Sequence, residues 1–181
     1  EKLKEETKHL EEKQIDYDNL KICTVGRIGF QKNPKMFNEI AKNFPNIQFT
    51  WIGDGELRSE LTSKNITITG WLERKDVLKE LNNNDIFILT SLWEGLPISL
   101  LEAMYMKKIC IVSDVIGNRD VIDNNYSGFI CNSAEEFKEV ISKINLYNYE
   151  NIIRRAYIEI LKKYNIKTEC EKYNKIYIML K

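Results

Sequence analysis

Two glutamates, Glu94 and Glu102, stand eight positions apart in the chemically most informative segment of the chain. Glu94 falls in a loop after an apolar run, and Glu102 falls about one turn inside the helix predicted to follow. The amides of Ile98, Ser99 and Leu100 would lie at the N-terminus of that helix, where free N–H donors suit a diphosphate. Flanking carboxylates can accept hydrogen bonds from sugar and ribose hydroxyls. The spacing alone fits equally well a capping arrangement around a buried loop.

A second group of polar residues follows the first apolar run, where Arg27 and Lys32 stand close to Gly26 and Gly29. Two cations beside a closely turning backbone can neutralise a diphosphate leaving group. The spacing matches neither G-x-x-x-x-G-K-[ST] nor G-x-G-x-x-G, so neither of these phosphate-binding loops is present. Taken alone, the two cations are also consistent with an ordinary solvated loop.

Two shorter motifs follow later runs. Gly53-Asp54-Gly55 predicts a tight turn, with Asp54 placed to cap a following helix. Gly70-Trp71-Leu72 offers a wall against a flat base, although Trp71 also fits a core position.

The elements that must position these residues form an alternating pattern of short apolar runs and helical segments. This pattern predicts an α/β fold, a Rossmann-like parallel sheet with helices on both faces. The predicted strands are residues 21–26, 47–52, 66–69, 85–90, 109–113 and 128–131, and the predicted helices are residues 34–43, 56–63, 75–82, 99–106 and 134–144. Asn33 is expected to cap the helix that begins at Pro34. Because parallel strands end at a common edge, the loops after the first four strands should share one rim.

Three regions follow from this pattern. Residues 1–19 are dense in Glu and Lys and predict a helical or flexible leader, or the remnant of an interdomain linker. Residues 20–147 form the predicted Rossmann-like domain. Residues 148–181 predict two helices rich in Tyr, Ile and Lys. The start at Glu1 rather than at a methionine suggests a processed or excised piece of a longer protein.

The composition argues against several classes of function. Lys plus Arg and Asp plus Glu both number 27, so the zero net charge gives no electrostatic case for nucleic acid. The single histidine, His9, lies in the leader, and the four cysteines form no C-x-x-C pair, so no metal site is expected. Cys23, Cys110 and Cys131 lie in apolar runs and are expected to be reduced core residues of a cytosolic protein. No apolar run approaches the roughly 20 residues of a membrane span.

In their order along residues 20–145, these motifs resemble glycosyltransferase family 4. The resemblance rests on V-G-R-…-K at Arg27 and Lys32, I-G-D-G at 52–55, Gly70 before the base-binding loop, and E-x7-E at Glu94 and Glu102. It continues through Ala103-Met104, Val112-Ser113, Gly117-Asn118-Arg119-Asp120-Val121-Ile122 and Ser127-Gly128.

The chain departs from the common family pattern at three positions. Pro97 stands where many members have glycine, which removes one backbone donor. Lys107 replaces a common glycine, and Asp120 replaces a common glutamate. These departures concern the details of the sugar contacts.

The resemblance implies the C-terminal half of a two-domain GT-B enzyme. Such an enzyme transfers a sugar with retention from a nucleoside diphosphate sugar, here expected to be a UDP-sugar, to a glycan or lipid-linked acceptor. Arg27 and Lys32 would hold the diphosphate, and Glu94 would bind the transferred sugar; these three are the expected catalytic residues. Glu102 would bind the ribose, and Leu72 would contact the base. The full expected donor-binding set is Gly26, Leu72, Gly95, Leu96, Pro97, Ile98, Ser99, Leu100 and Glu102. No metal and no other cofactor is implied.

The resemblance also implies partners outside this chain. An N-terminal domain of the same protein would supply the acceptor site, and the C-terminal helices would pack back toward it. The 181-residue chain alone is therefore expected to transfer no sugar. A cytoplasmic location is expected, with peripheral association of the full-length protein at the inner face of the membrane.

Two alternatives share the architecture, a nucleotide-sugar epimerase and a non-catalytic nucleotide-sugar-binding module. The presence of both cations and both glutamates favours transfer. A response-regulator-like domain would need an acidic cluster after the first strand, where Arg27 stands instead.

Overall fold

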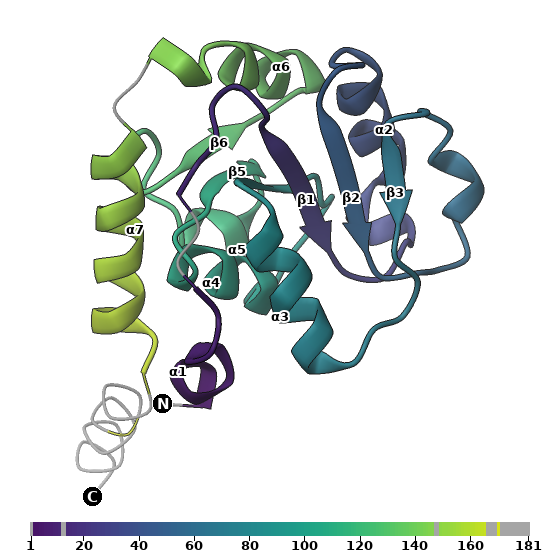
Figure 1. Cartoon of the computed structure of the whole chain (residues 1–181). Coiled ribbons are helices and arrows are strands. Elements are labelled where there is room, and N and C mark those ends of the chain that lie inside the picture. The colour runs from purple at the N-terminus through teal and green to yellow at the C-terminus, as the bar shows by residue number, and fades with distance from the viewer. Residues whose placement is uncertain (1, 12–13, 147–148, 166–169, 171–181) are drawn as a thin grey trace, which may run out of the picture.

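A parallel sheet forms the centre of the protein (Figure 1). The computed structural model describes residues 2–11, 14–146, 149–165 and 170. The strands are β1 (Lys21–Val25), β2 (Gln48–Ile52), β3 (Ile66–Ile68), β4 (Ile86–Leu89), β5 (Ile109–Ser113) and β6 (Phe129–Cys131). Their order across the sheet is β3-β2-β1-β4-β5-β6, and all neighbouring pairs are parallel. The predicted Rossmann-like α/β fold is confirmed.

Helices cover both faces of this sheet (Figure 1). The helices of the described residues are α1 (Lys2–Thr7), which lies apart from the sheet, and α2 (Pro34–Lys42), α3 (Arg74–Asn83), α4 (Ile98–Tyr105), α5 (Ile116–Arg119), α6 (Ala134–Ser142) and α7 (Tyr149–Lys163). In the described part of the chain, three short 3-10 turns accompany them, η1 (Phe30–Lys32), η2 (Arg58–Glu60) and η3 (Ile144–Leu146). Helices α2 and α6 pack together on one face, α3 and α4 lie on the other, and α7 packs against α4.

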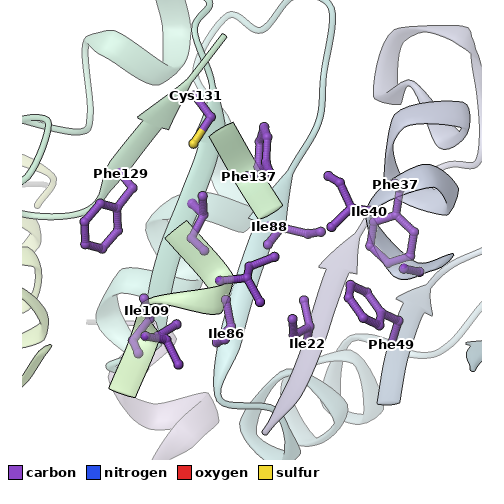
Figure 2. Close-up of a cluster of buried hydrophobic side chains, with 14 of the residues drawn as sticks. Ile22, Phe37, Ile40, Phe49, Ile86, Ile88, Ile109, Phe129, Cys131 and Phe137 are labelled. Atoms are coloured by element: carbon purple, nitrogen blue, oxygen red, sulfur yellow. The ribbon is translucent and has the colours of Figure 1, made fainter. Parts of the chain in front are cut away.

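The core consists of two apolar clusters, one on each face of the sheet. Neighbouring residues of one strand enter different clusters, as Ile22 and Cys23 of β1 do, because successive strand side chains point to opposite faces. Figure 2 shows the cluster beneath α2 and α6, in which the strands meet Phe37, Ile40 and Phe137. Burying a side chain of this size stabilises the fold by about 1.5–3 kcal/mol.

The start of α2 agrees with the prediction. Asn33 adopts a left-handed conformation with φ 51°, and its side chain accepts a hydrogen bond from the Met36 amide. Pro34 occupies the first turn, where its missing N–H costs nothing. The bounds of the other predicted helices and strands agree with the structure within two residues, except for residues 56–63.

The helix predicted for residues 56–63 is wrong. Only Arg58–Glu60 forms a short 3-10 turn. The backbone cannot continue as a helix because the Asn38 side-chain oxygen accepts both the Thr62 and the Ser63 amides, each at 2.8 Å. The segment is therefore tied to α2 instead of forming its own helical bonds.

The structure also decides two alternatives left open by the sequence, whether Asp54 caps a helix and whether Trp71 lies in the core. Asp54 does not cap an α-helix; its carboxylate accepts a hydrogen bond from the adjacent Gly55 amide and forms an ion pair with Arg58. Trp71 is not a core residue, since 68% of it is exposed.

Cys23, Cys110 and Cys131 are buried and free, as predicted. Burial raises the pKa of all three thiols, to about 12 for Cys131. Of the two helices predicted after residue 147, α7 is present, and most of the second prediction falls on residues 166–169 and 171–181, outside the described residues. Within the described part of the chain, no helix combines the length and apolar character needed to cross a membrane.

Candidate functional site

The site lies where the order of the strands changes direction. Strands β1 and β4 are neighbours at the centre of the sheet, although β2 and β3 separate them in the chain. In open parallel sheets, ligands bind beyond the carboxyl ends of the strands at such a reversal. The loop after β1 carries Arg27 and Lys32, and the loop after β4 carries Glu94. The fold thus places the two most informative sequence motifs side by side.

Hydrogen bonds hold these two loops together. The Leu92 amide donates to the Gln31 carbonyl at 2.8 Å, and the Thr90 hydroxyl donates to the Lys32 carbonyl at 2.8 Å. The Gln31 side-chain amide donates to the Trp93 carbonyl at 2.9 Å. Each loop therefore stabilises the conformation of the other.

Lys32 and Glu94 form a buried ion pair at the centre of the site. Lys32 Nζ lies 2.6 Å from Glu94 Oε1, and the two side chains are only 16% and 7% exposed. The Ser91 hydroxyl donates to the same oxygen at 2.6 Å. Gly26 has φ 149°, and a Cβ there would lie 3.0 Å from Lys32 Cε. Glycine at this position lets the lysine stem cross the backbone closely.

Arg27, the other predicted cation, makes a different contact. Its Nε lies 2.9 Å from Glu56 Oε2, and its side chain is 69% exposed. The structure therefore does not bring Arg27 and Lys32 to the same carboxylate. The backbone hydrogen bond of Glu56 and the Arg27 guanidinium hold the pKa of that carboxyl below its usual range. Because exposed ion pairs contribute little to stability, Arg27 can exchange Glu56 for an anionic ligand at small cost.

Helix α4 begins beside Glu94, and its first amides partly match the prediction. The Leu100 amide is already used, since it donates to the Pro97 carbonyl at 3.0 Å. The expectation of three free donors is therefore wrong for Leu100. Within the described chain, the amides of Ile98 and Ser99 donate to no protein acceptor, and they remain the donors of this helix end.

Helix α5, which the sequence did not predict, packs against the backbone of the Glu94 loop. A Cβ on Gly117 would lie 1.9 Å from the Gly95 carbonyl oxygen and 2.6 Å from that of Glu94. A Cβ on Gly95, in contrast, would meet no atom within 4 Å. Gly95 therefore has one side against α5 and one open side, and the next residue, Leu96, is 53% exposed.

Glu102 occupies a separate part of the site, on α4. It is 5% exposed, and its Oε1 lies 2.6 Å from Arg74 Nη1. Arg74 also pairs with Glu6 of the leader at 3.2 Å. Burial raises the pKa of the Glu102 carboxyl, although the Arg74 charge opposes this shift.

Arg74 is a site residue that the sequence did not predict, as are Gln31 and Ser91 beside Glu94. Arg74 is the first residue of α3, two residues after the segment predicted to contact the base. Its position beside that segment was the available signal, but no spacing rule connects residue 74 with Glu102 on another helix. Leu72, in the same segment, packs its side chain against the apolar cluster of α3 and α4.

Other features of the described chain lie outside this site. No group of three or more His, Cys, Asp or Glu residues among the described residues is arranged to hold a metal ion. A cavity of about 620 Å³ lies between the leader and α7 and includes Tyr17, Lys107 and Arg154. It contains none of the predicted donor-binding residues.

The Rossmann-like sheet has the GT-B type of fold that is also present in the solved structure of TarM, with a TM-score of 0.75. A family model described as "Glycosyl transferases group 1" matches residues 5–163, and the chain belongs to this family.

Two curated relatives are both named as transferases that act on sugars linked to undecaprenol through a diphosphate. The chain is 33% identical over 172 residues to the UDP-Gal:alpha-D-GlcNAc-diphosphoundecaprenol alpha-1,3-galactosyltransferase of Escherichia coli, covering 85% of this chain and 44% of the relative. It is 30% identical over 147 residues to the N,N'-diacetylbacillosaminyl-diphospho-undecaprenol alpha-1,3-N-acetylgalactosaminyltransferase of Campylobacter jejuni, covering 75% and 39%. The chain thus spans less than half of the length of each.

Solved structures with this fold include complexes with UDP. Anabaena HepE in complex with UDP has a TM-score of 0.79 and 14% identity, over 98% of this chain and 52% of HepE. The pneumococcal O-GlcNAc transferase GtfA, in complex with UDP and GlcNAc, has a TM-score of 0.68 and 18% identity, over 90% and 37%. At these identities the likeness concerns the fold.

Proposed function

We propose that this chain is the donor-binding half of a retaining glycosyltransferase that uses a UDP-sugar. The observation that carries this proposal is the buried Lys32–Glu94 pair at the reversal of strand order, beside the free amides of α4. A sugar diphosphate needs a cation for its phosphates and a carboxylate for its sugar hydroxyls, at adjacent positions. Lys32 and Glu94 are such a combination.

Each group has a role in this proposal. Lys32 and Arg27 bind the diphosphate and stabilise the negative charge that it gains as the bond to the anomeric carbon breaks. The amides of Ile98 and Ser99 add the positive end of α4. Glu94 accepts hydrogen bonds from the sugar hydroxyls. The acceptor hydroxyl forms the new bond to the anomeric carbon, its proton passes to an oxygen of the departing diphosphate, and UDP leaves.

The remaining donor contacts follow the sequence prediction. Glu102 accepts hydrogen bonds from the ribose hydroxyls, and the backbone of Leu72 contacts the base. Gly95 presents its open side to the donor. This assignment gives each half of the E-x7-E motif one end of the nucleotide sugar.

The acceptor and the location are proposed from the relatives. Both relatives described above are named for acceptors joined to undecaprenol through a diphosphate. We therefore propose a lipid-linked saccharide acceptor and a full-length protein that works at the inner face of the membrane. The other half of the protein positions the acceptor, so that the 181-residue chain binds the donor without transferring sugar.

Calorimetric titration of the chain with UDP, GDP and ADP tests donor binding. We expect saturable binding, tightest for UDP, and loss of at least about tenfold in affinity for Lys32→Ala. Lys138→Ala is the matched control, because Lys138 pairs with Glu39 between α6 and α2 and belongs to neither site loop. Absence of saturable binding for all three nucleotides at millimolar concentration would contradict the proposal.

The stereochemistry needs the full-length protein. Proton NMR of the first product formed from an α-linked UDP-sugar gives the anomeric configuration directly. An α-linked product is expected, and a β-linked product would exclude retention.

A further inference from the structure

Arg74 connects two parts of the proposed nucleotide site. It begins α3 two residues after the base segment Gly70-Trp71-Leu72, and its Nη1 reaches the Glu102 carboxylate on α4 at 2.6 Å. Its Nη2 and Nε reach Glu6 of the leader at 3.2 and 3.3 Å. One guanidinium thus joins three elements that are far apart in the sequence.

Because Glu102 is buried, its contact with Arg74 affects the protonation of the carboxyl group. Only 7% of the Glu102 side chain is exposed, and a carboxylate in such surroundings favours the protonated form. A protonated carboxyl is a weaker acceptor for ribose hydroxyls than a carboxylate. A fixed cation beside Glu102 therefore affects both its charge and its orientation.

The ion pair uses one of the two carboxylate oxygens. Arg74 contacts Oε1, and a carboxylate has about four acceptor sites on its two oxygens. The second oxygen can therefore serve a ligand while the first is held by the guanidinium.

We propose that Arg74 is a positioning residue for the ribose of the nucleotide, which holds Glu102 beside the base segment with one oxygen left for the ribose hydroxyls. This inference rests on the proposed role of Glu102 in nucleotide binding. Arg74 acts through Glu102 and sets the distance between the base contact and the ribose contact.

The charged surroundings of Glu102 define what a pH experiment reports. Arg74 of α3 favours the ionised carboxylate, and Glu6 of α1 disfavours it. Helix α7, which packs on the same helix, contributes the uncharged Ala156 and Ile160 to the shared apolar cluster. The titration of Glu102 is thus governed by burial and by these two residues.

The first experiment compares UDP with 2′,3′-dideoxy-UDP, which lacks both ribose hydroxyls. We expect the wild-type chain to prefer UDP by about ten- to a hundredfold, and Arg74→Met to reduce this preference to about twofold. Methionine keeps the apolar stem, Arg74→Lys should restore most of the preference, and Lys138→Ala should leave it unchanged. An unchanged preference in Arg74→Met would overturn the inference.

The second experiment reads Glu102 without a nucleotide, from its ¹³C carboxyl signal between about pH 4 and pH 8. We expect Arg74→Met to move the titration midpoint upward and Glu6→Gln to move it downward. The second shift keeps the test decisive if Arg74→Met does not fold. Identical midpoints in the wild type and the folded variants would also overturn the inference.

The two experiments separate the possible failures. A wild-type chain that binds UDP and discriminates against the dideoxy analogue, with Arg74→Met unaltered, refutes Arg74 alone. A wild-type chain that binds neither nucleotide refutes the proposed function, and the ribose role of Arg74 with it, even if the midpoint moves.

Discussion

The two glutamates of the E-x7-E motif are equally buried but are held by different means. The side chains of Glu94 and Glu102 are each 7% exposed. Glu94 is fixed by Lys32, Ser91 and a longer contact of 3.4 Å from Gln31, all from loops at the edge of the central strands. Glu102 pairs with the half-exposed Arg74, which also pairs with the leader.

This difference shows how one motif can join two kinds of site. The position of Glu94 follows from the sheet, because β1 and β4 bring its partners together at their ends. The position of Glu102 follows from α4, whereas its charge is set by burial, by Arg74 of α3 and by Glu6 of the leader. Damage to the sheet-edge loops should therefore affect Glu94 and its lysine first, whereas loss of Arg74 should affect Glu102 and the contact with the leader but not Glu94.

Gly117→Ala is expected to have the largest effect. Its Cβ would lie 1.9 Å from the Gly95 carbonyl oxygen, so the Glu94 loop or α5 must move. Because the clash is with backbone atoms, we expect a loss of more than about 3 kcal/mol in the free energy of unfolding, measured by urea denaturation, and a clear loss of UDP affinity.

Gly95→Ala is the matched control for this substitution. A Cβ on Gly95 meets no protein atom within 4 Å, so stability should be unchanged. If the donor lies against Gly95, the same methyl group should still weaken binding of a UDP-sugar. Equal destabilisation by the two substitutions would show that the support of the Glu94 loop by α5 is wrongly assigned.

Lys32→Ala and Arg27→Ala should differ in folding stability almost as much as the two glycine variants do. Lys32→Ala leaves Glu94 buried without its cation, which is expected to cost about 3 kcal/mol of folding free energy. Arg27→Ala removes an exposed pair and should leave thermal unfolding unchanged within error. Both should weaken UDP binding, since both cations are proposed to bind the diphosphate. Equal thermal stability of the two variants would contradict the burial contrast on which this prediction rests.

The sequence predicted much of this arrangement because its signals are local. Alternating apolar runs gave the strands, Asn33 and Pro34 gave the start of α2, and the spacing of Glu94 and Glu102 gave the loop and helix between them. It did not predict that Lys32 meets Glu94, 62 residues away, or that Arg74 meets Glu102. Such pairs depend on strand order and helix packing, which no local spacing encodes.

The helix predicted for residues 56–63 was wrong for a related physical reason. Their composition suits a helix, but the Asn38 side chain accepts two of the amides in the segment after η2. Tertiary hydrogen bonds overrode helix propensity there.

Kinetics of the proposed transfer reaction, measured with the full-length protein, should separate the roles of the two glutamates. Glu94 is proposed to contact the sugar that changes charge during transfer, so Glu94→Gln should lower kcat by about ten- to a hundredfold and leave UDP affinity nearly unchanged. Glu102→Gln should mainly raise the donor KM, by about tenfold, because ribose contacts are similar in the ground and transition states. Equal loss of UDP affinity in both variants would refute this division.

The smallest expected effect concerns stability, and here the two glutamates should differ in sign. Burial raises the pKa of Glu102 above its value in the unfolded chain. A group with a raised folded pKa contributes stability below its unfolded pKa and loses it as the pH rises through the folded pKa. Ionised Glu102 therefore costs stability at neutral pH, and the neutral Glu102→Gln should recover it.

We expect Glu102→Gln to raise the melting temperature by about 1–3 °C at neutral pH, with the gain disappearing below about pH 4. Arg74 keeps its pair with Glu6 in this variant, so its charge is not left alone. Glu94→Gln should instead lower the melting temperature at neutral pH, because the buried charge of Lys32 would lose its carboxylate partner. Scanning calorimetry of both variants at the two pH values decides the matter, and destabilisation by both at neutral pH would show that Arg74 compensates the burial of Glu102 more fully than we infer.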